Sequence, residues 1–171
     1  MTEADMPQKD QSYLRQAAEC WAKGESLEAG KLIYENLPSK ARPRWAARIL
    51  MLVLDRSGIE SPLFGEVLYI TQHEGMWRNG HRVFSTLRRE TLKLLEIQET
   101  QGLTKEQELL YSIVSLAELV AKVIYNATNP QDEFDEDSGW WIAACVRGFM
   151  DNFWSDERFA KAAWSALCSC E

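Results

Sequence analysis

The sequence feature that most constrains the fold is a long, strongly apolar segment at residues 104–126. Thr104 and Gln107 have the spacing of a capping box, in which each side chain accepts a hydrogen bond from a main-chain amide at the start of a helix. The apolar residues that follow recur at helical spacing and cover most of the helix circumference: Leu109, Leu110, Ile113, Val114, Leu116, Leu119, Val120, Val123 and Ile124. A helix that is apolar on nearly all sides must be surrounded by other helices. We therefore expect this segment to form the centre of a helical bundle.

The polar positions of the same segment form a narrow stripe. Glu118 and Lys122 belong to it and are four residues apart, which is a favourable spacing for an ion pair along a helix.

The rest of the chain divides into further predicted helices, and no segment shows the alternation expected of a β-strand. We expect Ser26 to cap one helix and the pair Ser61-Pro62 to begin another. Gly58 and Gly102 mark breaks between helices. The predicted fold class is all-α, a single-domain bundle of about eight helices packed around residues 104–126. We expect residues 1–10 to be a disordered tail and residues 11–171 to form one helical domain.

Residues 17–38 contain the series Trp21, Gly24, Glu28-Ala29, Tyr34 and Leu37-Pro38. This series resembles the second half of a tetratricopeptide repeat, in which a glycine and an alanine let two helices approach closely. The resemblance implies a helical hairpin, and because no second copy follows at the repeat period, it implies no repeat array. Residues 134–143 are similar to a segment of small uncharacterised bacterial proteins, which implies no activity.

The composition limits the classes of partner. A net charge of −7 and a pI near 5.0 argue against nucleic acid and anionic membranes as main partners, whereas a basic protein would be attracted. The first residues lack the apolar core of a signal peptide, and no apolar stretch is long enough to span a bilayer. We therefore expect a cytoplasmic location.

We expect neither a metal nor a cofactor. His73-Glu74 lacks the second histidine of a zinc-protease helix, because position 77 is tryptophan. The acidic run Asp132–Asp137 does not have the ligand spacing of a calcium-binding EF-hand. Two histidines and no nucleophile motif give little means of acid–base catalysis, so we expect no catalytic residues and favour a protein that is not an enzyme.

Two hypotheses follow for function. The first is a protein-interaction module, either an adapter or a small acidic inhibitor of the immunity-protein type. Its expected contact residues are acids, aromatics and arginines: Asp135, Glu136, Asp137, Trp140, Trp141, Arg44 and Arg48. The alternative is an enzyme or small-molecule sensor with a pocket at His73, Trp77 and His81. Whether the cations at Arg42–Arg48 pair with the acidic run inside the chain, and the oligomeric state, are left open by the sequence.

Overall fold

The structure is a computed structural model that describes residues 12–128 and 138–169. These residues form eight α-helices and two short 3-10 helices, with no strand among them, so the all-α fold class is confirmed. In chain order the elements are α1 (Ser12–Ala22), α2 (Ser26–Asn36), η2 (Ser39–Ala41), α3 (Arg42–Ser57), α4 (Pro62–Thr71), η3 (Glu74–Asn79), α5 (Gly80–Gln101), α6 (Lys105–Thr128), α7 (Ser138–Asn152) and α8 (Glu157–Cys168).

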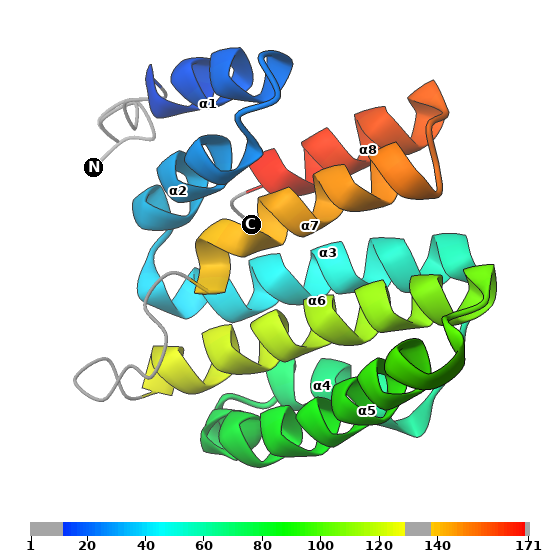
Figure 1. The fold of residues 1–171 in the computed structure, drawn as a ribbon. Coiled ribbons are helices and arrows are strands. Elements are labelled where there is room, and N and C mark those ends of the chain that lie inside the picture. Colours follow the sequence, from blue (N-terminus) through cyan, green and yellow to red (C-terminus); the bar gives the residue numbers. More distant parts are fainter. Residues whose placement is uncertain (1–11, 129–137, 170–171) are drawn as a thin grey trace.

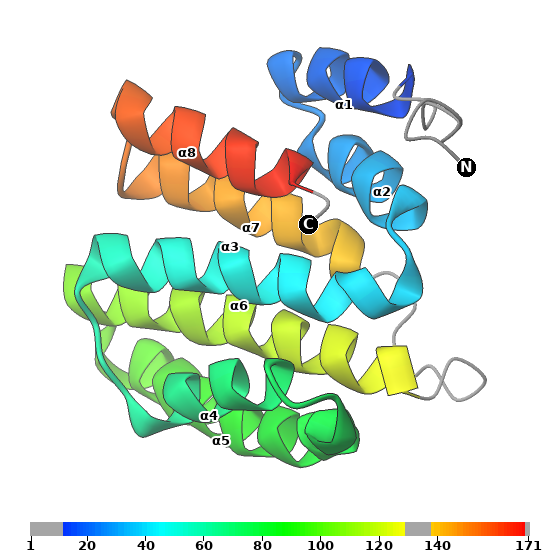
Figure 2. The ribbon, with the colours of Figure 1, turned by 180° about the vertical axis from the view of Figure 1, so that it is seen from behind.

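The helices are stacked in pairs (Figure 1). Helices α3 and α6 run side by side through the middle, α7 and α8 cover one side of them, and α4 and α5 cover the other. The hairpin of α1 and α2 packs against α7, and the view from behind shows α3 in front of α6 (Figure 2). Buried side chains from all eight helices belong to one hydrophobic core. The described helices therefore form a single bundle.

Helix α6 is the centre of this bundle, as the sequence predicts. It contacts α3, α4, α5 and α7, and Leu116 and Val120 in its middle are fully buried. The capping box is present at its start. The Thr104 amide donates to Gln107 Oε1 at 2.9 Å, and the Gln107 amide donates to Thr104 Oγ1 at 3.2 Å.

One residue of the polar stripe of α6, Glu118, is buried instead of facing solvent. Glu118 is buried beneath α5, where its carboxylate accepts a hydrogen bond from Thr91 Oγ1 and lies 3.6 Å from Arg88 Nη1. A buried carboxylate is tolerated when it is hydrogen-bonded and paired. These partners on α5 could not be predicted from spacing along α6, because they are about 30 positions away in the chain.

The contact between α2 and α7 depends on two glycines that the sequence did not single out. A Cβ on Gly30 would lie 2.3 Å from the Trp140 carbonyl oxygen, and one on Gly139 would lie 2.2 Å from the Tyr34 ring. By contrast Gly24, the glycine of the tetratricopeptide resemblance, ends α1 with a φ of 81° and would meet no atom within 4 Å. The close approach is thus made by α2 on α7, and Gly24 serves the turn between α1 and α2.

The predicted cap at Ser26 is wrong. Ser26 is already the first residue of α2, and Glu25 occupies the capping position without a side-chain hydrogen bond to the helix. Within the described residues, no helix has the combination of length and apolar character needed to cross a membrane.

Candidate functional site

The first predicted contact surface is described only in part. Asp135, Glu136 and Asp137 lie outside the described residues. Trp140 is half-buried at the start of α7, with Lys31 Nζ 4.6 Å from the centre of its ring, whereas Trp141 is 48% exposed. Of the two tryptophans, Trp141 is therefore the more accessible.

The arginines of the same prediction differ in their surroundings. Arg44 is exposed, whereas Arg48 is half-buried and donates from Nη2 to the Ser169 carbonyl oxygen at 3.1 Å. The guanidinium of Arg42 lies 4.3 Å from the centre of the Tyr34 ring. Part of the cationic cluster is thus engaged by the chain itself. Its pairing with Asp132–Asp137 stays a prediction, because that run lies outside the described residues.

The residues of the alternative pocket have separate environments. Trp77 is 3% exposed and belongs to the core, where its Nε1 donates to the Thr71 carbonyl oxygen at 3.2 Å. His73 is exposed and lies against Tyr69, with ring centres 4.3 Å apart, and the His81 ring lies 5.5 Å from that of Tyr125. Only the two histidines are therefore accessible to a ligand. Among the described residues, no group of three or more His, Cys, Asp or Glu is placed to hold a metal ion.

The surface has two depressions, one on each side of the loop after α3. The sequence analysis does not predict them. One depression of about 400 Å³ lies between α3 and α4, and a second of about 410 Å³ lies between the end of α3 and the start of α6. Ile59 lines both, so we call the two together the Ile59 groove. Its described lining residues are Leu54, Asp55, Ser57, Gly58, Ile59, Glu60, Ser61, Phe64, Gly65, Leu68, Glu106, Gln107, Leu109 and Leu110.

Local sequence explains why the chain turns here. Gly58 ends α3 in the left-handed conformation with a φ of 68°, which glycine adopts readily, and its amide donates to the Leu54 carbonyl oxygen at 2.9 Å. Ser61 then caps α4 by accepting from the Leu63 amide at 3.3 Å, as the sequence predicts, and Pro62 is the first helical residue. The short connection holds α3 and α4 side by side as the two walls of one depression.

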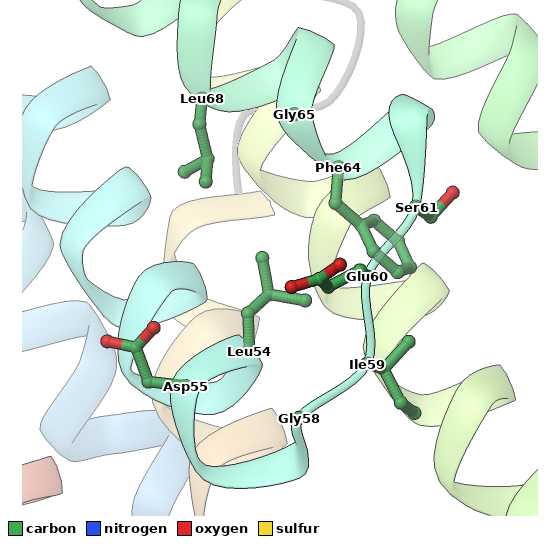
Figure 3. A pocket seen from close by; sticks show the side chains of 9 residues that line it. All are labelled: Leu54, Asp55, Gly58, Ile59, Glu60, Ser61, Phe64, Gly65 and Leu68. Carbon is green, nitrogen blue, oxygen red and sulfur yellow. The ribbon is translucent and has the colours of Figure 1, made fainter.

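Apolar side chains form the floor and walls of the groove. Figure 3 shows Leu54 and Leu68 pointing toward each other from α3 and α4, with the Glu60 carboxylate between Leu54 and Phe64. On the far side of Ile59, Leu109 and Leu110 of α6 continue the apolar lining. Met51, one turn before Leu54 on α3, is 45% exposed. Because Met51 and Leu54 are three residues apart on α3, their side chains lie on the same ridge of that helix.

Three carboxylates lie around the groove without a cationic partner. Asp55, Glu60 and Glu106 are exposed, and none of them forms an ion pair with a described residue. Neighbouring acids are neutralised, because Glu66 pairs with Arg82 at 2.7 Å and Asp156 pairs with Arg56 at 2.6 Å. The groove therefore combines apolar side chains with negative charge, and the Glu60 carboxylate lies within it, between Leu54 and Phe64.

Gly65 opens the α4 side of the groove. It lies in the interior of the helix, and a Cβ there would meet no atom within 4 Å. Glycine in a helix interior costs about 1 kcal/mol relative to alanine. No neighbouring atom requires this glycine, unlike Gly30 and Gly139. Two features of the sequence could have indicated the groove. One is Gly65, and the other is the apolar Ile59 in a loop flanked by Asp55 and Glu60.

The described lining of the groove offers little catalytic chemistry. It contains neither histidine nor cysteine, and the hydroxyl groups of its two serines are engaged. Ser57 Oγ donates to the Leu54 carbonyl oxygen and accepts from the Ile59 amide, and Ser61 Oγ caps α4. A smaller depression of about 160 Å³ between α6 and α7 is lined by Cys145, and burial raises the pKa of that thiol to about 11. A thiol with so high a pKa is a poor nucleophile near neutral pH.

Comparison of the chain with protein-family models, with curated proteins and with solved structures finds no significant match.

Proposed function

We propose that the protein is a protein-interaction module, such as an adapter or a small acidic inhibitor, and that the Ile59 groove is its docking surface. The observation that carries this proposal is a pair of adjoining depressions, both lined by Ile59, that combine apolar side chains from α3, α4 and α6 with carboxylates lacking an ion-pair partner in the described chain. Protein-binding surfaces commonly have an apolar centre and a polar rim.

The chemistry of the groove supports a macromolecular partner rather than a small ligand. Small-molecule sites enclose most of the ligand and aim a few polar groups at it. The Ile59 groove extends over two adjoining depressions, and carboxylates lie around it at Asp55, Glu60 and Glu106. The described lining also lacks a nucleophile–base pair, which argues against an enzymatic role for this surface.

The face of α7 that carries Trp141 is a second proposed contact surface for the same function. Its support is the 48% exposure of a large aromatic side chain, since tryptophan often anchors a protein interface.

Site-specific photo-crosslinking of the full-length protein in cells of its source tests both surfaces. Benzoylphenylalanine is placed separately at Gly65, at Trp141 and at Gly75, an exposed glycine of η3 that also has open space around it. We expect one specific adduct from position 65 and none from position 75. We also expect Met51→Asp, introduced on the facing ridge of α3, to suppress that adduct while the melting midpoint stays close to that of the unsubstituted protein, because Met51 is 45% exposed.

Three outcomes would contradict the assignment of the groove. They are no adduct at any position, an adduct at position 65 that persists with Met51→Asp, and a specific adduct at position 141 alone. The last outcome would move the docking surface to α7.

A further inference from the structure

We infer that the occupant of the Ile59 groove is an amphipathic helix of a partner protein, with an apolar face and basic residues beside it. This inference rests on the proposed function, because it names the partner class for the same surface.

The shape of the groove favours a helix. One wall is a ridge of α3 at Met51, Leu54 and Gly58, and the facing ridge of α4 carries Ser61, Phe64 and Leu68. Both ridges have the three- and four-residue spacing by which helices interlock. An apolar stripe of a third helix, with residues at i, i+3, i+4 and i+7, matches such a groove.

The other common ways of binding a peptide do not fit this surface. Strand addition needs an exposed sheet edge, and the described residues contain no strand. Proline-rich peptides bind between aromatic side chains. Phe64 is the one aromatic residue in the described lining, and it is buried.

Gly65 gives a partner helix room to approach. It stands on the α4 wall with nothing within 4 Å of the position of a Cβ, so the backbone of α4 is accessible there. A helical glycine at an open surface permits close approach of another backbone. A side chain introduced at this position would begin in open space on the α4 wall of the groove.

The charges select a basic partner. Asp55, Glu60 and Glu106 are lining residues of the groove, and no described cation pairs with them. The nearest opposite charges in sequence are engaged elsewhere, because Arg56 pairs with Asp156 and Lys105 lies 3.5 Å from Glu108. Lysine or arginine beside the apolar face of the incoming helix would supply the missing partners, and such rim charges act mainly on the rate of association.

The test uses the full-length protein and three fluorescent peptides of about 15 residues, a length at which a helix is marginal alone and is stabilised by contact. All three carry leucine at the same helical positions, and their polar positions are lysine, glutamine or glutamate. Dissociation constants are measured by anisotropy at low and high salt. The protein variants are Gly65→Trp, its control Gly75→Trp at another exposed glycine with open space around it, and the double charge reversal Asp55→Lys with Glu60→Lys.

We expect the lysine peptide to bind about tenfold more tightly than the glutamine peptide at low salt, and the glutamate peptide to bind least. We expect Gly65→Trp to weaken binding of the lysine peptide by about tenfold, as loss of a central interface contact does, and Gly75→Trp to leave that binding unchanged. The charge reversal is expected to weaken it by about fivefold or more at low salt and by much less at high salt. Circular dichroism and melting of each variant verify that the fold is retained.

Equal binding of the lysine and glutamine peptides would overturn the basic partner. Binding of the lysine peptide that Gly65→Trp does not weaken would place the peptide elsewhere on the acidic surface and would also overturn the inference. If crosslinking from position 65 identifies a groove-dependent partner segment that is acidic or not helical, the partner class is wrong and the docking surface stands. If that segment is a second copy of this chain, the occupant is a homologous subunit and the inference is likewise wrong. Absence of both peptide binding and crosslinking would remove the proposed function as well.

Discussion

Replacing Gly65 with alanine is expected to stabilise the protein. Gly65 lies inside α4 with ordinary helical geometry, since it is not among the glycines with positive φ. The methyl group of alanine would meet no atom within 4 Å, so it neither clashes nor fills a cavity. The change therefore acts through the conformational freedom of the chain alone.

The size of the effect follows from this geometry. Alanine is favoured over glycine in a helix interior by about 1 kcal/mol, and most of the gain arises because the unfolded chain has fewer conformations to lose. For a chain of 171 residues this corresponds to a rise in the melting temperature of about 2–4 °C.

Urea unfolding and thermal melting measure the change, with Gly139→Ala as the contrasting variant. A Cβ on Gly139 would lie 2.2 Å from the Tyr34 ring, so this variant is expected to be less stable than the wild type although it makes the same substitution. If Gly65→Ala lowers the free energy of unfolding, the glycine has an internal structural role. The view that its open space serves an approaching partner would then be refuted.

Three further predictions concern the core, a helix cap and a thiol. Leu116→Ala in α6, at a fully buried position, should lower the free energy of unfolding by about 2–5 kcal/mol, whereas Leu92→Ala at a half-exposed position should change it little in the same urea titration. The Phe159 amide, which donates to Asp156 at 3.0 Å, and the neighbouring Arg56 hold the pKa of Asp156 below its usual value. The pKa of Asp156 is therefore lower in the folded state than in the unfolded state. Its charge stabilises the fold at pH values above the unfolded-state pKa. This stabilisation is lost as the pH falls through the folded-state pKa, in the region below about pH 4. Asp156→Asn keeps a capping oxygen without a titrating charge, so its stability should fall less between neutral pH and about pH 3; an equal fall would refute the role of the charge. Burial raises the pKa of Cys145 to about 11, so iodoacetamide should alkylate it far more slowly in the native protein than in urea, and labelling at equal rates would contradict the assignment.

The acids of the Ile59 groove are dispersed in the sequence. The sequence analysis predicts a contact surface that includes Asp135, Glu136 and Asp137, and this stays a prediction because those residues lie outside the described part of the chain. In the described part, an apolar lining with unpaired carboxylates occurs around the loop at residues 58–60. Its acids come from Asp55 and Glu60 near the end of α3 and from Glu106 at the start of α6, so no single stretch of sequence carries a recognisable run.

The sequence alone determined the all-α class, the central position of residues 104–126, the capping box at Thr104 and the cap at Ser61. These features depend on helical periodicity and on hydrogen bonds between residues within a few positions of each other, so local sequence is sufficient to specify them. Tertiary structure decided which helix faces meet. It buried Glu118 beneath Thr91 and Arg88 of α5, set Gly30 against α7, and placed Trp77 in the core. It also assembled the Ile59 groove from residues up to about 50 positions apart. Such contacts depend on the packing of whole helices, and the periodicity of one helix does not specify which side chains its neighbours present to it.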